Sequence, residues 1–241
     1  MKKIILVLAA MAALSAGAFA QELDSDINEI SLTKEDSPFH ADLHVAAPMY
    51  FGASVLVNPT YKGVWALSDK FQDMQTGKNF VYGLEMAAVH FFADGSPLDI
   101  SLGLRWTFMD FTFKDSSITF REPGGYFIPF PIKMENAGYD GKKSKIHANY
   151  LGIPLRFTVQ ADDFRAFVGA SAEYLVSGYT KYKNPKFRQG ASGIFNGFRA
   201  TVEAGVSYKS LGFFVNYGLT PLFPEALSDA RTLTFGVVLG K

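Results

Sequence analysis

The stretch Leu98-Asp99-Ile100-Ser101-Leu102-Gly103-Leu104-Arg105-Trp106-Thr107-Phe108 decides the fold class, because its side chains alternate strictly between two kinds. Every second residue from Leu98 to Phe108 is apolar, whereas the residues between them are small, polar or charged. A period of two is that of a β-strand with unlike faces, and a helix cannot produce it. The stretch therefore predicts a strand with one apolar and one polar face.

The same alternation recurs in seven further segments, which predicts eight strands in all. These segments are Met49–Val57, Tyr82–Phe92, Leu151–Val159, Ala166–Val176, Phe198–Tyr208, Phe213–Leu219 and Leu233–Leu239. Short connections at 93–97, 161–164 and 209–211 alternate with long ones near 58–79, 114–145, 181–193 and 221–230. An antiparallel up-and-down array then places every long loop at one end and every tight turn at the other.

Charge is sorted between the two faces of these strands. The apolar face of the eight segments holds no Asp, Glu, Lys or Arg, whereas the other face holds Glu85, Asp99, Arg105, Arg156, Glu173, Arg199 and Glu203. A soluble calyx would hide the apolar face inside, and a membrane barrel would turn it outward. The second face is otherwise rich in Gly, Ser and Thr, which suit a narrow lumen, and aromatic residues lie near the strand ends. We therefore predict an eight-stranded transmembrane β-barrel, with His90 as the one titratable side chain facing lipid.

The N-terminal residues carry an export signal. Lys2 and Lys3 precede the apolar run Ile4–Leu14, and Ala18-Phe19-Ala20 supplies small residues around a cleavable bond. This pattern predicts a signal peptide at 1–20, cut after Ala20. Residues 21–40 are acidic and poor in apolar side chains, so we expect a mobile periplasmic leader or a short plug-like arm there, followed by the barrel domain at 41–241. Export and a membrane barrel together predict the outer membrane of a Gram-negative cell.

The composition excludes several other classes of protein. Lys and Arg number 23 against 23 Asp and Glu, and this balance argues against a nucleic-acid binder. The chain has no cysteine, so neither a disulfide framework nor a thiolate metal site can form. Residues 21–241 contain no apolar run of the length that a helical membrane span requires. We expect no cofactor and no metal.

The charged residues of the inner face predict a network in the lumen. Eight strands enclose a space just wide enough for side chains, and an unpaired charge there would be costly. Three acids match three arginines in number: Glu85, Glu173 and Glu203 against Arg105, Arg156 and Arg199. We expect charge-assisted hydrogen bonds among them, with a structural role, because a closed lumen gives a substrate no entry.

The loop near 114–145 differs most in composition from the other connections. Its stretch Arg121–Pro131 is rich in aromatic residues and proline, and we expect it to fold over the barrel mouth or to extend the hairpin. The alternative is a surface for a partner or ligand, formed by Tyr126, Phe127, Phe130, Lys142 and Lys143. The lysines, with Lys145, are placed to meet anionic lipopolysaccharide.

A lipid-modifying hydrolase is the least favoured function. Only His147 among the four histidines lies at the loop end, with Ser144 nearby, and no orienting carboxylate is close in sequence. We therefore predict a protein without enzymatic activity.

One segment resembles a known family. Residues 149–157, Asn-Tyr-Leu-Gly-Ile-Pro-Leu-Arg-Phe, resemble the Y-L-x-I-P-L strand of PorT-like outer-membrane β-barrel proteins, common in Bacteroidetes, and Phe167–Tyr174 is similar to the strand that follows. The resemblance covers 41–241 and implies an outer-membrane barrel inserted by the assembly machinery, with a secretion partner in some members. The chain departs from many outer-membrane proteins by ending on Leu239-Gly240-Lys241 instead of an aromatic residue.

These observations favour a non-enzymatic outer-membrane barrel that presents extracellular loops and contacts lipid and lipopolysaccharide. The alternatives are a component of a secretion or transport assembly, and a small pore.

Overall fold

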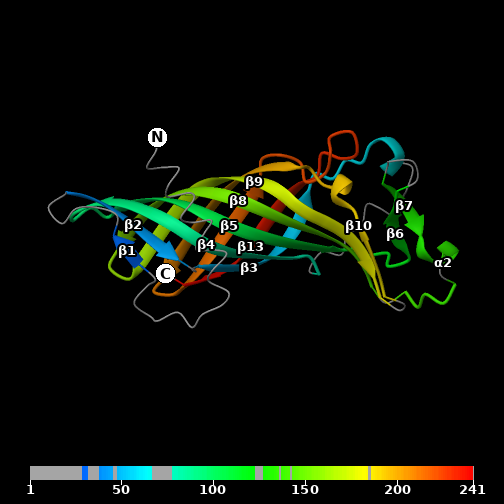
Figure 1. Cartoon of the computed structure of the whole chain (residues 1–241), viewed down its shortest axis with the longest axis horizontal. Helices are drawn as coiled ribbons and strands as arrows, with labels where there is room; N and C mark the ends of the chain where they lie inside the picture. The colour runs from blue at the N-terminus through cyan, green and yellow to red at the C-terminus, as the bar shows by residue number, and fades with distance from the viewer. Residues whose placement is uncertain are drawn as a thin grey trace.

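Eight strands close into an antiparallel barrel, as the sequence predicts (Figure 1). The computed structural model describes residues 29–31, 38–45, 48–66, 78–122, 127–135, 137–141, 143–183 and 186–240. Around the barrel the strands follow the order β3-β13-β12-β11-β9-β8-β5-β4, and β4 pairs again with β3. Their bounds are β3 Met49–Val57, β4 Phe80–Ala93, β5 Leu98–Thr112, β8 Ser144–Ala161, β9 Phe164–Tyr182, β11 Phe198–Tyr208, β12 Leu211–Gly218 and β13 Arg231–Leu239.

The connections sort between the two ends of the barrel. Tight turns at 94–97, 162–163 and 209–210 lie at one end, here named the turn end, and the long connections lie at the other, the loop end. Asp162 and Lys209 adopt positive φ angles of 52° and 53°, a left-handed conformation that lets a two-residue turn reverse the chain. The predicted alternation of short and long connections is confirmed.

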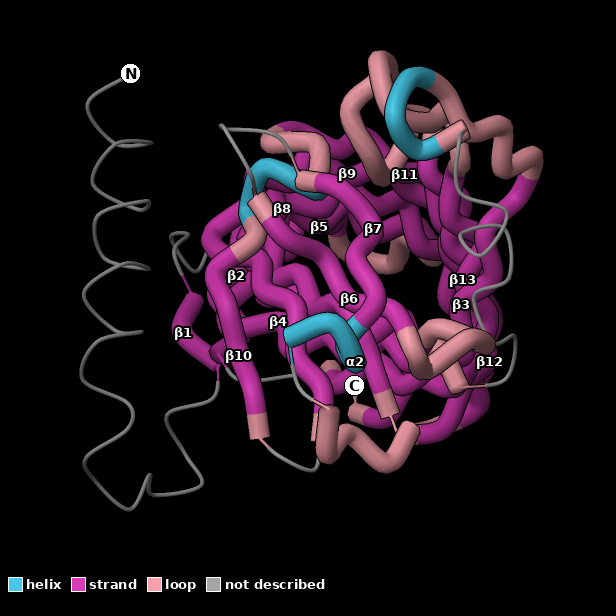
Figure 2. Tube along the Cα trace, turned by 90° about the vertical axis from the view of Figure 1, so that its right-hand side faces the viewer, coloured by secondary structure: helices cyan, strands magenta, loops and turns pink. Residues whose placement is uncertain are grey.

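Additional short elements cover the loop end. They are the hairpin of β6 (Ile118–Arg121) and β7 (Ile128–Pro131), the helix α2 (Ile132–Glu135), the strand β10 (Phe187–Gly190) paired with β9, and the 3-10 turns η1 (Gly63–Trp65) and η4 (Ser192–Ile194). Figure 2 looks onto this end and shows β6 and β7 in front of the ring of strands. Among the described residues, no helix is long and apolar enough to cross a membrane.

An apolar core fills the lumen at the loop end. Inward side chains of the strands, such as Met109, Phe111 and Ile146, pack against buried residues of the loops. The loop residues are Trp65, Ile118, Phe120, Phe127, Ala191, Ile194, Phe195, Leu222, Phe223 and Ala230. The indole Nε1 of Trp65 donates a hydrogen bond to the carbonyl oxygen of Phe127 at 3.0 Å, which ties two loops together. Apolar burial of this kind fixes the loops over the barrel mouth.

The turn end carries two strands that the period-two pattern does not predict. β1 (Glu29–Ser31) pairs with β2 (Phe39–Val45), and β2 pairs with the last seven residues of β4. β2 and β3 thus lie one after the other along the same edge of β4. The expected boundary between a mobile leader and the barrel at residue 40 falls inside β2, so it does not mark the start of regular structure.

The expectation that His90 faces lipid is wrong. The register between β4 and β5 shifts between Glu85 and Ala87, so that Met86 is an extra residue in β4. A β-bulge of this kind moves every later residue of the strand to the opposite face. His90 therefore lies opposite Ser101, on the lumen side, and Phe91 takes the outward position.

The outer wall of the barrel is apolar. A belt of large exposed side chains surrounds it, including Phe51, Leu102, Ile153, Leu155, Phe157, Val168, Val202, Val206, Phe213, Val215 and Phe235. Residues adjacent to these along each strand, such as Arg156 and Glu203, are buried on the inner face. The two faces thus differ in polarity, as the period-two pattern predicts.

Closure of the barrel at the β3–β13 seam depends on glycine. Gly236 lies opposite Gly52, and a Cβ at position 236 would stand 2.0 Å from the carbonyl oxygen of Phe51. We predict that Gly236→Ala lowers the free energy of unfolding by about 1–3 kcal/mol, because the strands must separate to admit the methyl group. The measurement is the loss of β-sheet circular dichroism with increasing urea. Gly190→Ala is the control, because its Cβ meets nothing within 4 Å; equal stability of the two variants would contradict the prediction.

Candidate functional site in the barrel lumen

The six charged residues assigned to the lumen lie together in one buried layer. Glu85, Arg105, Arg156, Glu173, Arg199 and Glu203 come from β4, β5, β8, β9 and β11, and all are buried. Two of the acids stand directly opposite an arginine in the strand register, Glu85 opposite Arg105 and Glu173 opposite Arg199. Strand pairing therefore places opposite charges at the same height along the barrel axis.

Glu203 is the centre of this layer. Its carboxylate accepts a hydrogen bond from Arg105 Nη1 at 2.7 Å and another from Arg156 Nε at 2.5 Å. One carboxylate thus bridges two guanidinium groups that come from different strands.

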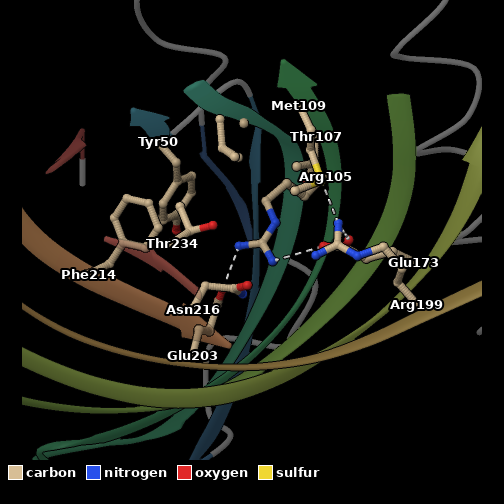
Figure 3. A pocket seen from close by; sticks show the side chains of 12 residues that line it. Tyr50, Arg105, Thr107, Met109, Glu173, Arg199, Glu203, Phe214, Asn216 and Thr234 are labelled. Carbon is tan, nitrogen blue, oxygen red and sulfur yellow. Dashed lines mark hydrogen bonds and ion pairs between the residues drawn. The ribbon is translucent and has the colours of Figure 1, made fainter. Parts of the chain in front are cut away.

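The remaining pairs extend from this centre in two directions. Arg156 Nη1 lies 2.6 Å from a carboxylate oxygen of Glu85. On the other side, Arg105 Nη2 lies 3.6 Å from Glu173, whose second oxygen accepts a hydrogen bond from Arg199 at 3.0 Å (Figure 3). The six charges form an unbroken chain in which acid and base alternate: Glu85, Arg156, Glu203, Arg105, Glu173, Arg199.

Uncharged residues, which the charge pattern of the strands does not reveal, complete the layer. The ring centroid of Tyr50 lies 5.3 Å from the guanidinium carbon of Arg105 and 5.3 Å from that of Arg156. Arg199 donates to Thr232 Oγ1 at 3.1 Å and to Met109 Sδ at 2.9 Å. Tyr50 is on the inward parity of its predicted strand, so attention to neutral residues of that face would have found it.

The charged layer leaves almost no free space. A cavity of about 30 Å³ lies among Tyr50, Arg105, Glu203, Phe214 and their neighbours. This volume holds a water molecule or two, and no solute of biological size.

On the turn-end side of the charged layer, the lumen opens into a chamber lined by many polar side chains, here named the vestibule. It has a volume of about 840 Å³ and extends to the turn end, with Arg156 and Glu85 among the residues of its inner wall. His90 Nδ1 lies 2.6 Å from Asp99 Oδ2, and the rings of His44 and His90 are 4.5 Å apart. Within the described part of the chain, no group of three or more His, Asp or Glu residues is arranged to hold a metal ion.

The comparisons with known proteins identify a similar solved structure but no family. No protein-family model matches the chain, and no curated protein matches it. The crystal structure of Neisserial surface protein A is similar to this chain, with 10% sequence identity and a TM-score of 0.36. The alignment covers 85% of this chain and 98% of that protein.

The serine and histidine considered for a hydrolase do not come together. Ser144 is fully buried on the inner face, whereas His147 belongs to the outward parity of β8. His147 does have a carboxylate partner that the sequence spacing hides, because Asp110 of β5 lies opposite it and contacts Nδ1 at 2.7 Å. Its other ring nitrogen, Nε2, is 2.6 Å from Asn149 Oδ1 rather than from a hydroxyl group. Both ring nitrogens of His147 are therefore occupied by contacts with Asp110 and Asn149.

The residues assigned to a possible loop surface differ in their placement. Phe127 is buried in the apolar core, and Phe130 is half-buried in β7. Lys143 is half-buried immediately before β8, and burial together with the nearby Lys145, Lys183 and Lys181 lowers its pKa. Tyr126 and Lys142 lie outside the described residues.

We predict that Glu203→Gln lowers the free energy of unfolding by about 3–5 kcal/mol, because Arg105 and Arg156 then keep buried charges without their shared counterion. Urea unfolding in detergent micelles, followed by intrinsic fluorescence, measures this change. Glu225→Gln is the matched control, because Glu225 is exposed in the β12–β13 loop. A Glu203→Gln protein as stable as the control would show that the charge chain contributes nothing to the fold.

Proposed function

We propose that this protein is a non-enzymatic outer-membrane β-barrel of a Gram-negative cell, closed along its lumen, that presents its loop end at the cell surface. The observation that carries the proposal is the sorting of side chains between the two faces. Apolar side chains cover the outer wall, and the charge chain from Glu85 to Arg199 lies inside. A soluble barrel requires the opposite arrangement.

The extent of the apolar wall supports burial in a bilayer. Soluble proteins rarely expose contiguous apolar patches larger than a few hundred Å², and this belt continues around the strands. Seven of the eight barrel strands have 9 residues or more, the length that a tilted strand needs to cross the hydrocarbon, and β12 has 8. Closure also satisfies the backbone hydrogen bonds, which lipid cannot do.

Exposed aromatic residues lie toward both ends of this wall. Phe80, Tyr82, Tyr174 and Phe198 lie toward the loop end, and Phe91, Phe164, Tyr208 and Phe213 lie toward the turn end. Aromatic rings favour the two interfaces between bilayer and water. These two groups of aromatic residues support a bilayer that surrounds the barrel wall between the tight turns and the long loops.

The connections support one orientation. Bacterial barrels have short periplasmic turns and longer extracellular loops, so the loop end faces outward and the vestibule opens to the periplasm. The predicted signal peptide, cut after Ala20, supplies the export that this location requires. The proposal includes insertion by the outer-membrane assembly machinery.

The contents of the lumen support a closed barrel over a small pore. From the loop end to the turn end, the lumen holds the apolar core, then the charge layer, and then the vestibule. An ion entering from the vestibule meets the Glu85–Arg156 pair and the packed side chains behind it. The closed lumen and the hydrogen-bonded His147 likewise support a protein without enzymatic activity.

We predict that the folded protein purifies only with detergent, migrates faster on a gel unboiled than boiled, and gives no single-channel current in planar bilayers. A closed barrel resists the gel detergent until it is heated, and its filled lumen offers ions no continuous path. A urea-denatured sample is the control for folding. Stable current steps would indicate a pore, and recovery of folded protein from periplasm without detergent would indicate a soluble calyx.

A further inference from the structure

Three cations stand side by side on the outer wall at the loop end. Lys145 of β8 lies directly opposite Lys181 of β9, and Lys181 lies directly opposite Arg188 of β10. The three residues are here named the cation row. They follow His147 and Tyr179, which form the next outward pair toward the turn end.

Such an arrangement is unfavourable by itself. Like charges directly opposite each other on neighbouring strands destabilise a sheet. Lys143 lies close enough to Lys145, Lys181 and Lys183 for these like charges, together with burial, to lower its pKa. Asp110 forms an ion pair with Lys145 but is also bound to His147, so its single charge does not balance the group.

An aromatic ring holds two of these cations in place. The guanidinium carbon of Arg188 lies 3.8 Å from the ring centroid of Tyr179, and Lys181 Nζ lies 5.2 Å from the same centroid. The opposite neighbour of the ring is His147, which stacks on it at 4.5 Å. Tyr179 therefore positions positive charge at a fixed place on the wall.

On the turn-end side of the cation row, the outer wall carries apolar and aromatic side chains. Tyr82, Phe108 and Trp106 stack in a column, with centroids 4.8 Å and 5.7 Å apart. Leu151 of β8 lies opposite Trp106 and joins this column to β9, where it lies opposite Tyr174. Tyr174 is 69% exposed and the nearby Val176 is 50% exposed. One continuous face thus offers apolar contact on the membrane side and positive charge at the loop side.

We propose that this face binds the phosphate groups of lipid A in the outer leaflet, with the acyl chains lying along the apolar wall. The inference rests on the proposed function, which places the loop end at the outer surface. Phosphate oxygens accept charge-assisted hydrogen bonds from Lys and Arg, and a bound phosphate relieves the repulsion within the cation row. A free phosphate ion would use the cations but leave the apolar wall without a partner.

The test compares two variants with the same change of charge. Lys181→Gln/Arg188→Gln removes two cations of the row, whereas Lys62→Gln/Lys209→Gln removes two exposed lysines elsewhere, each 3.8 Å from an aspartate. Native mass spectrometry of the full protein in detergent counts bound diphosphoryl lipid A. We expect the row variant to bind about 25-fold more weakly, from about five-fold for each cation, and the control to bind as the unaltered protein does.

A thermal readout separates binding from folding. Without lipid, the row variant should unfold at the same temperature as the unaltered protein or higher, since repulsion is removed. With diphosphoryl lipid A, only the unaltered protein and the control should gain stability. The unaltered protein and both variants must first show heat-modifiable migration. Failure of the unaltered protein counts against the proposed function, and Arg188→Gln alone replaces the row variant if the double substitution prevents folding.

Three results would overturn the inference. They are equal lipid A binding by both variants, equal stabilisation by dephosphorylated lipid A, and equal stabilisation by phosphatidylglycerol or inorganic phosphate. The last would assign the row to any anion instead of to lipid A.

Discussion

The shared carboxylate of Glu203 is the interaction on which the interior depends. It joins Arg105 and Arg156, and through them the ion pairs that reach Glu85 and Glu173. A narrow lumen excludes most of the water that would otherwise solvate these groups, so each charge needs a partner of opposite sign. Because the partners come from five neighbouring strands, the pairing requires the sheet to curve round the lumen, and it favours one register for each strand.

This layer also divides the molecule into regions of different character. On the loop side, the strands and loops share an apolar core around Trp65 and Phe111. On the turn side, the vestibule retains polar groups such as His90 and Asp99. Only the outer wall is continuous from one end to the other, which agrees with contact to lipid along its length. The proposed function therefore concerns the outer wall and the loop end rather than the lumen.

The sequence predicts the strands well because each barrel strand has two unlike surroundings. Leu98–Phe108 shows this alternation without interruption, and β5 contains the whole stretch. The six charged residues of the lumen follow from the same parity. Their pairing does not, since whether Glu203 meets Arg105 or Arg199 depends on strand order and register. The assignment of His90 fails for a related reason, because one extra residue at Met86 reverses the parity behind it.

Contacts between segments that are distant in sequence cannot be predicted from the period-two pattern of single strands. The cation row joins positions 145, 181 and 188 through two strand pairings, and Asp110 reaches His147 through a third. β1 and β2 are similar, because they are set by strand pairing rather than by their own composition: β2 pairs with β4, and β1 pairs with β2. Local sequence gives the face of a residue, but strand pairing decides its neighbours.

The seam between β3 and β13 joins the first strand of the ring to its last. Thr234 donates to Ser54 across it at 3.1 Å, although 180 positions separate them along the chain. A polypeptide shortened before residue 231 would leave β3 and β12 each with an open edge, ready to pair with another molecule. The barrel therefore cannot close until β13, a strand of 9 residues near the C-terminus, has been synthesised and paired.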